Sequence, residues 1–292
     1  MRSTLLSMSL LVAVAAVGCN RERNQSIQLM NKGIAQFNLN DTTGAVVALN
    51  QATSVDPTND AAFYYRGLLK YQRTSDYPEA VKDFKKAIEV NGENHLYHYH
   101  LGKVLSRQGE WASAINALEK AIERKPEHAA SHYHLGAALE QQAKFDRAQE
   151  EYVAAIKAQP RFADPYVALG NLYARFEKLP EAVQVFKNGI ENNPEKAELR
   201  HDLGVVYQNQ QRFDDAIGQF QAAVKLKPTY LSALFNLGMA YQQTDNAEQA
   251  ITHLKLYLGR RQAGEDALRV RTAEDTIAKL EAAALAPPPS TP

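Results

Sequence analysis

The sequence predicts an all-α protein built as a solenoid of about seven helical hairpins, with a capping helix at its C-terminal end. Three observations support this prediction. A period of 34 residues runs through most of the 292 residues, prolines interrupt it at regular places, and 45% of the residues are hydrophobic against 23% charged. Such a composition is typical of a globular chain, and a period of this length is typical of stacked helical repeats.

The charge balance and the cysteine count exclude several classes of protein. The chain has 33 Lys and Arg against 33 Asp and Glu, and its pI is about 7.1. Because binding to phosphates depends on a surplus of basic residues, we expect no nucleic-acid partner. The single cysteine excludes an internal disulfide framework and a zinc site built from several cysteines.

Residues 1–18 have the features of a secretory signal peptide. Arg2 supplies a positive charge, and an apolar segment from Leu5 to Val17 follows it. A helix of that length reaches about 20 Å, short of a hydrocarbon core of roughly 30 Å, so we expect cleavage rather than a membrane span. Residues 16–19, Ala-Val-Gly-Cys, resemble the bacterial lipobox, although Ala16 stands where Leu is usual. An ordinary signal peptide with an incidental cysteine is the alternative.

The lipobox resemblance implies a lipid anchor at Cys19. This residue then receives a diacylglyceryl group and becomes the mature N-terminus, and Asn20 in place of Asp favours the outer membrane, facing the periplasm. Residues 19–25 are expected to form a short linker, in which the six residues after the cysteine span at most about 20 Å. Arg21 and Arg23 either contact anionic headgroups or belong to a solvated spacer.

Glycine marks the repeat period. The glycines are spaced 34, 35, 34, 34, 34 and 34 residues apart, at Gly33, Gly67, Gly102, Gly136, Gly170, Gly204 and Gly238. An alanine follows each glycine by 12 or 13 residues, and a bulky residue follows four later, at Leu49, Phe84, Leu118, Tyr152, Phe186, Phe220 and Leu254. Small residues permit two consecutive helices to approach closely, the bulky residue fills the adjacent space, and a proline such as Pro126 ends the unit. Each unit is therefore a helical hairpin, and we place the extra residue of the 35-residue unit in a longer turn at 75–78.

Further residues give the period a family resemblance. Leu precedes the glycine in units three to seven, and Tyr173, Tyr207 and Tyr241 stand three residues after it. This pattern resembles the tetratricopeptide repeat (TPR), which implies a right-handed superhelical solenoid. We expect seven TPR repeats over 26–264, at 26–59, 60–94, 95–128, 129–162, 163–196, 197–230 and 231–264. The first and last repeats depart from the pattern, as is expected of terminal repeats.

A final helix is expected over 265–286. Leu268, Ala273, Ile277, Leu280 and Ala284 recur at helical spacing along one stripe, so this helix is expected to cap the seventh repeat. Residues 287–292, Pro-Pro-Pro-Ser-Thr-Pro, are interpreted as a disordered proline-rich tail, with a PxxP-type ligand as the alternative.

No catalytic signature is present in the sequence. GxxxxGK[ST], GxGxxG after a strand, HExxH and GxSxG are all absent, so we expect a protein without catalytic residues, cofactor or bound metal. The alternative from another class is a histidine-based metal-binding protein. His98 and His132 are 34 residues apart, as are His100 and His134. His128 and His132 have the i, i+4 spacing of metal ligands on a helix, but duplication of one unit explains the matched pairs equally well. A pH-sensing role is a further alternative for these histidines.

A second stripe on the first helix of each repeat predicts a binding surface. Residues three before, and one, four and five after, each glycine lie away from the Leu-Gly packing side, and in TPR proteins this stripe lines the concave wall. The candidate partner-binding residues are Tyr64, Tyr71, Tyr99, Arg107, Tyr133, Gln141, Asn171, Arg175, His201, Asn209 and Phe235. Aromatic side chains beside Arg and amide groups are typical of peptide and protein recognition. We expect some of the tyrosines to pack between repeats instead.

The pattern as a whole predicts a non-catalytic scaffold, lipid-anchored in the bacterial envelope, that binds a peptide or protein in its concave groove. A lipobox followed directly by TPR units is similar to the pilotin lipoproteins of type IV pili and to the TPR lipoproteins of tight-adherence pili. That similarity implies a role in assembling a pilus or secretin complex, with a secretin or pilus component as the partner. An adaptor for peptidoglycan hydrolases and proteases, with a cell-wall enzyme as its partner, is the alternative within the same class.

Overall fold

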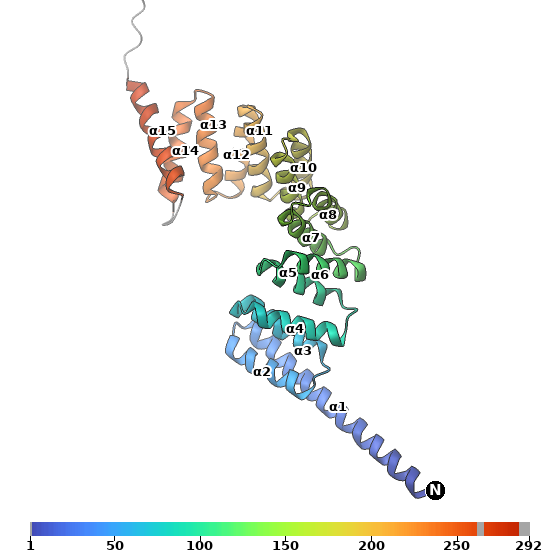
Figure 1. Cartoon of the computed structure of the whole chain (residues 1–292). Coiled ribbons are helices and arrows are strands. Elements are labelled where there is room, and N and C mark those ends of the chain that lie inside the picture. The colour runs from blue at the N-terminus through green and yellow to red at the C-terminus, as the bar shows by residue number, and fades with distance from the viewer. Residues whose placement is uncertain (1, 262–265, 286–292) are drawn as a thin grey trace, which may run out of the picture. The chain divides into compact units, whose positions relative to one another are not determined.

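Helices and short connections make up the whole of the described chain. The computed structural model describes residues 2–261 and 266–285, with side chains from Asn20 onward, and contains no strand in these ranges (Figure 1). The chain divides into two compact units, Met1–Glu151 and Tyr152–Pro292. The predicted all-α solenoid of helical hairpins is confirmed, while the hand of its superhelix stays a prediction.

Consecutive helices pair into hairpins. The first unit contains α1 (Arg2–Asn38), α2 (Thr42–Val55), α3 (Asp60–Leu69) with a π-helical turn η1 (Lys70–Thr74), α4 (Tyr77–Val90), α5 (His95–Arg107), α6 (Trp111–Arg124) and α7 (Ala129–Gln141). Helix α8 (Phe145–Ala158) spans the boundary. The second unit contains α9 (Ala163–Arg175), α10 (Leu179–Asn192), α11 (Ala197–Asn209), α12 (Phe213–Leu226), α13 (Leu231–Gln243), α14 (Ala247–Arg260) and α15 (Ala267–Leu285). Within each unit, a hairpin packs against the next hairpin along the chain (Figure 1).

The periodic glycines allow the two helices of a hairpin to touch. A Cβ added to Gly170 would lie 2.4 Å from Cζ of Phe186, and one added to Gly102 would lie 2.5 Å from Cγ of Leu118. Phe186 and Leu118 are fully buried. The predicted contact between a small residue on the first helix and a bulky residue on the second is therefore present.

The connection inside each hairpin contains one residue with a positive φ. These residues are Asn40, Ser75, Gly109, Ala143, Glu177, Gln211 and Asp245. The residue that follows immediately precedes the second helix, and the side chains of Asp41, Asp76 and Asn246 cap that helix by accepting a hydrogen bond from a backbone N–H. Only Gly109 has the residue type that adopts this conformation without steric cost.

The extra residue of the second repeat is not in the loop at 75–78, so that prediction is wrong. Ser75 and Asp76 occupy the same two places as Gly109 and Glu110, and the additional residue lies before them, in η1. The Asp76 N–H bonds the Lys70 carbonyl six residues back, whereas the Glu110 N–H bonds the Leu105 carbonyl five residues back. The insertion is therefore absorbed by widening the last helical turn, which keeps the backbone groups hydrogen-bonded.

The packed part of the first hairpin begins at Ser26, since residues 20–25 before it are exposed. Ser26 is fully buried; its hydroxyl donates to the Ala52 carbonyl at 2.8 Å and accepts from Asn59 Nδ2 at 2.9 Å. Residues 20–25 continue α1 as helix, rising about 9 Å, rather than forming an extended linker. The side chain of Cys19 lies outside the described side chains. Within the described residues, no helix is both long and apolar enough to cross a membrane.

Helix α15 packs against the last hairpin, but only some of the residues expected to face that hairpin do so. Ala273 and Ile277 are buried against Leu234, Leu254 and Tyr257. Leu268 and Ala284 were expected on the same stripe but are exposed, and Thr276 is buried in their place. The expected start at 265 and the tail at 287–292 lie outside the described residues.

Candidate partner-binding surface

Helices α3, α5 and α7 and the turn η1 carry the aromatic candidates of the first unit, and these differ in exposure. Tyr64 and Tyr99 are buried, each with 9% of its surface exposed, and burial raises the pKa of each hydroxyl to about 12. Tyr71 and Tyr133 are half-buried, and Gln141 is exposed at the end of α7. Tyr71 and Tyr133 can therefore be reached from solvent, whereas Tyr64 and Tyr99 mainly hold neighbouring helices together.

Tyr99 lies at the centre of a cluster of imidazoles from α5 and α7. Its ring centroid lies 4.8 Å from that of His100, 4.9 Å from that of His128 and 5.6 Å from that of His134. Burial lowers the pKa of His100 to about 3, and burial together with neighbouring cations and imidazoles lowers those of His128 and His134 to about 4. These three imidazoles are therefore neutral at pH 7 and serve as packing groups.

Lys103 and Arg107 stand beside Tyr71. The Lys103 Nζ lies 5.8 Å from the ring centroid of Tyr71 and 5.3 Å from that of Tyr99, and burial lowers the pKa of Lys103. A hydrogen bond with the Tyr71 side chain raises the pKa of Arg107, which is itself exposed. Arg73 in η1 lies over the ring of Phe37 at 4.9 Å. None of these three cations is in an ion pair with a carboxylate of the described chain, so this surface is positively charged and open to an acidic ligand.

The second unit presents a more polar row on α9, α11 and α13. Asn171, Arg175 and Asn209 are exposed, and His201 and Phe235 are half-buried. His201 Nδ1 lies 2.8 Å from Asp202 Oδ1, and its Nε2 accepts from Asn236 Nδ2 at 3.1 Å. The ring of Phe235 contacts that of Tyr257 at 5.4 Å. His201 and Phe235 are thus partly engaged in packing, and the amide and Arg side chains remain toward solvent.

Three histidines of the metal-binding alternative, His98, His128 and His132, are engaged in hydrogen bonds. His132 Nδ1 lies 2.6 Å from Glu151 Oε2 and its Nε2 lies 2.7 Å from the Pro126 carbonyl, an arrangement that raises the pKa of His132. His128 Nδ1 pairs with Ser131 Oγ at 2.7 Å, and His98 Nε2 with the Gly92 carbonyl at 2.9 Å. Among the described residues no group of three or more His, Cys, Asp or Glu is arranged to hold a metal ion. These contacts favour a structural role.

Lys103 is the residue of this surface that sequence reasoning did not single out. It stands one residue after Gly102, on the predicted stripe, but the stripe alone does not indicate that its ammonium bridges two tyrosine rings. The signal available was the spacing of Lys103, four residues after Tyr99 and four before Arg107, which places all three on one helix face.

The stacked hairpins and the polar and aromatic stripe on their first helices define the class of protein: a helical-repeat scaffold for protein–protein interaction. The chain belongs to the tetratricopeptide repeat family, whose model matches residues 30–95, 68–115, 99–143, 138–197 and 201–267. TPR proteins are typically non-catalytic. No curated protein matches the chain.

Solved structures show the same fold. YrrB, a TPR protein with an unusual peptide-binding site, is 24% identical with a TM-score of 0.52, and the match covers 67% of this chain and 99% of YrrB. MamA is 26% identical with a TM-score of 0.54, covering 60% of this chain and 94% of MamA. Pseudomonas aeruginosa pilF is 17% identical with a TM-score of 0.62, covering 75% of this chain and 98% of pilF.

Proposed function

We propose that this protein is a non-catalytic scaffold, lipid-anchored through Cys19 at the periplasmic side of a bacterial outer membrane. In this proposal it binds an acidic segment of an envelope protein along the first helices of its repeats. The partner is a component of a pilus or secretin complex. An adaptor for cell-wall hydrolases and proteases is the second candidate, and it uses the same surface.

The observation that carries the binding proposal is the positively charged surface formed by Tyr71, Lys103 and Arg107. Its cations have no carboxylate partner within the described residues, and Lys103 is held between two rings in a partly desolvated position. Such a cation binds an incoming carboxylate more strongly than a fully hydrated one does. The peptide-binding site reported for YrrB supports the use of a TPR surface for a peptide ligand.

The anchor and the partner class rest on the sequence. The lipobox resemblance at 16–19 and Asn20 support outer-membrane sorting, and the order of lipobox and TPR units supports the pilus or secretin role. The short helical segment at 20–25 keeps the first repeat close to the lipid, so the anchor would hold the binding surface near the membrane.

The test is in-cell crosslinking followed by affinity capture and mass spectrometry on the full-length tagged protein. We expect capture of a secretin or pilus subunit, lowered about tenfold in Arg107→Glu and in Tyr71→Ala. These residues are preferred over Tyr99, because Tyr99 is buried and its removal would disturb the fold. Arg147→Glu is the matched control, since Arg147 is an exposed arginine on α8, paired with Glu119 at 2.8 Å.

Three further outcomes discriminate the proposals. Capture of cell-wall enzymes with the same dependence on Arg107 would select the adaptor. Equal capture by Arg107→Glu, Tyr71→Ala and wild type would contradict the binding surface. Unchanged membrane association of Cys19→Ala after cell fractionation would contradict the lipid anchor.

A further inference from the structure

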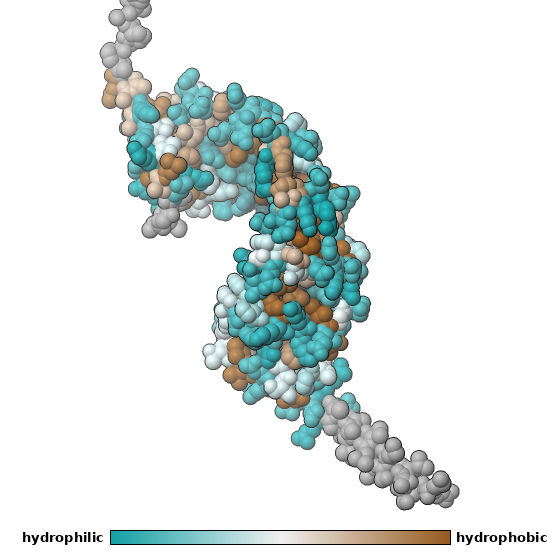
Figure 2. Space-filling view, in the orientation of Figure 1, coloured by the Kyte–Doolittle hydropathy of each residue, from teal (hydrophilic) through white to brown (hydrophobic). Residues whose placement is uncertain are grey.

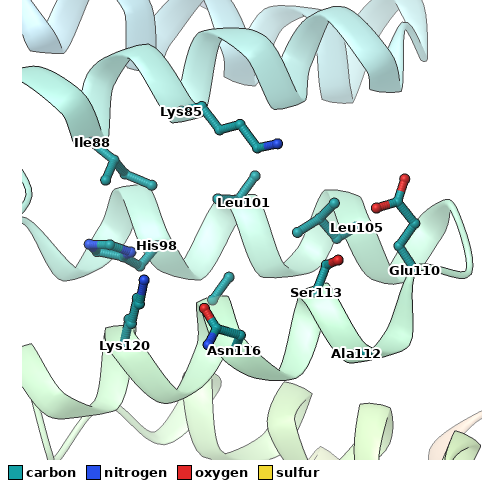
Figure 3. A pocket seen from close by; sticks show the side chains of 11 residues that line it. Lys85, Ile88, His98, Leu101, Leu105, Glu110, Ala112, Ser113, Asn116 and Lys120 are labelled. Atoms are coloured by element: carbon teal, nitrogen blue, oxygen red, sulfur yellow. The ribbon is translucent and has the colours of Figure 1, made fainter.

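A cleft of about 590 Å³ opens between α4 and α6, across α5 (Figure 3). Leu101 and Leu105 of α5 and Ile88 of α4 form its apolar lining, and Lys85, Lys120 and Glu110 stand around it. Leu101 and Leu105 lie on the face of α5 opposite Tyr99 and Lys103, because the two pairs are about half a turn apart on the helix. Apolar surface is visible in the region of α4 to α6 in Figure 2. The cleft is thus separate from the positively charged surface.

The sixth and seventh repeats have a tyrosine at the position of Leu105. Tyr207 and Tyr241 stand three residues after their glycines, as Leu105 does, and both are buried. The Tyr241 hydroxyl accepts a hydrogen bond of 2.6 Å from Gln221, the residue that follows Phe220. Lys85 follows Phe84 and so stands in the place of Gln221. Because Leu105 has neither the ring nor the hydroxyl of Tyr241, the second and third repeats leave open a space that Tyr241 occupies in the sixth and seventh.

The charges around the cleft favour an anion beside its apolar lining. Lys85 and Lys120 come from opposite walls, both are exposed, and neither forms an ion pair with any described residue. Glu110 lies at the other end of the cleft, near Leu105, whereas Lys120 lies near His98 (Figure 3). The His98 imidazole is already engaged with the Gly92 carbonyl. A ligand that places a ring over Leu101 and Leu105 would therefore place an attached carboxylate toward the two lysines.

We propose that this cleft binds a peptide segment of a partner protein that presents a tyrosine next to an acidic residue. The tyrosine ring takes the space that Tyr207 and Tyr241 fill in their own repeats, and the acidic side chain lies between Lys85 and Lys120. This site is independent of the proposed function, because it uses the opposite face of α5.

The test is a titration of the full-length protein with the peptide acetyl-Gly-Tyr-Asp-Gly-amide, followed by methyl NMR of labelled Ile and Leu. We expect shifts at Ile88, Leu101 and Leu105 and a dissociation constant on the order of 1 mM, typical of a small ligand with one anchoring side chain. Peptides with Ala in place of Tyr, or Asn in place of Asp, should each bind several-fold more weakly. Equal binding of all three peptides, or shifts confined to other methyl groups, would overturn the proposal.

Two variants locate the site on the protein. Leu105→Tyr supplies the residue of the later repeats and should abolish binding while the circular dichroism spectrum stays that of a folded helical protein. The surface variant Lys85→Glu with Lys120→Glu should weaken binding about tenfold without touching the apolar lining. Lys187→Glu is the matched control, because Lys187 follows Phe186 as Lys85 follows Phe84 but faces a repeat whose tyrosine, Tyr207, is present. Wild-type affinity in both the Leu105→Tyr protein and the double lysine variant would refute the assignment.

Discussion

At the scale of single residues, the two helices of a hairpin can approach closely because the first helix has a glycine, which lacks a Cβ, at their contact. Added Cβ atoms at Gly170, Gly204 and Gly238 would lie 2.4, 2.6 and 2.7 Å from the bulky residue of the second helix. In contrast, a Cβ at Gly218 meets nothing within 4 Å, although Gly218 is also inside a helix. The two kinds of glycine have opposite effects on stability, because one is required for close approach and the other only weakens its helix.

Alanine substitution separates these two kinds of glycine. Gly170→Ala should lower the free energy of unfolding by about 1–3 kcal/mol, because the Phe186 ring must shift in a filled core. Gly218→Ala should raise it by about 0.5–1 kcal/mol, because alanine favours the helix and has free space. Urea denaturation followed by circular dichroism measures both. A loss of stability in both variants, or in neither, would contradict the packing at Gly170.

At the scale of elements, α5 is held against α3 and α4 by rings that include the neutral His100. His100 is surrounded by Tyr64, Phe84 and Tyr99, with centroid distances of 5.5, 5.9 and 4.8 Å, and its Nδ1 is buried without a hydrogen-bond partner. Lys103, His134 and His128 are the nearby charged or titratable groups that oppose its protonation. Packing between these helices therefore depends on the imidazole staying uncharged.

Acidification should weaken this packing. The pKa of His100 is about 3 in the folded protein against an ordinary value of 6.5, so its stabilising contribution is complete above pH 6.5 and is lost progressively as the pH falls toward 3. Between pH 6.5 and 5 this amounts to about 2 kcal/mol. Thermal unfolding at pH 6.5 and at pH 5 should show that the melting temperature falls less on acidification in His100→Phe than in wild type. His132, whose pKa is raised, contributes with the opposite sign and is the same in both proteins. An equal decrease in both proteins would argue against a buried neutral His100.

The sequence predicts the helices of the hairpins well, but it does not predict the places where a helix departs from the regular repeat. Glycine, alanine and bulky residues at fixed intervals predict the hairpins because each residue type has one packing role. The π-helical turn at Lys70–Thr74 could not be predicted, because an extra residue fits equally well into a loop when only spacing is known. Similarly, the stripe on α15 predicts Ala273 and Ile277 as buried, but Leu268 is exposed, and the adjacent Arg269 contacts Ser232 of the hairpin instead.

The sequence predicts which residues lie on the candidate binding face of a helix, but it does not predict which of them are accessible to solvent. Tyr71 and Arg107 on the predicted stripe remain accessible, but the stripe did not distinguish them from Tyr99, which is covered by His128 at the end of its own repeat and by His134 of the next one. Whether a ring faces solvent depends on the side chains opposite it in a neighbouring hairpin, and a single repeat does not contain that information.

At the scale of the whole molecule, stability is a property of neighbouring repeats. Within each unit a hairpin packs against its neighbours along the chain, and a terminal hairpin has a neighbour on one side only, so it needs a cover. Helix α15 covers the fully buried Leu234, Leu254 and Tyr257 at the C-terminal end. Tyr257 occupies a place where the other repeats have a small residue, and it is compatible with the fold because α15 packs against it.

Removing this cover should expose the last hairpin. A chain that ends after Arg261 should lose about 1.5–3 kcal/mol for each large side chain uncovered and should self-associate as the concentration increases. Sedimentation velocity and urea denaturation measure the two effects. A chain that ends after Leu285 is the control and should behave as the full-length protein does. A monomeric, equally stable truncated chain would show that α15 is dispensable.

The widened turn at the end of α3 changes how one repeat corresponds to another. Counted forward from the glycine, Gln72 is the counterpart of Arg107, but counted back from the residue with positive φ, Arg73 is. Residues before η1 in the second repeat therefore align with the other repeats when counted from the glycine, and residues after η1 align when counted from the residue with positive φ. Duplication or recombination of such units need not conserve their length. A single widened turn can restore the alignment of the two helices, and it brings a different side chain, Arg73 in place of Gln72, to the position that Arg107 has in the third repeat.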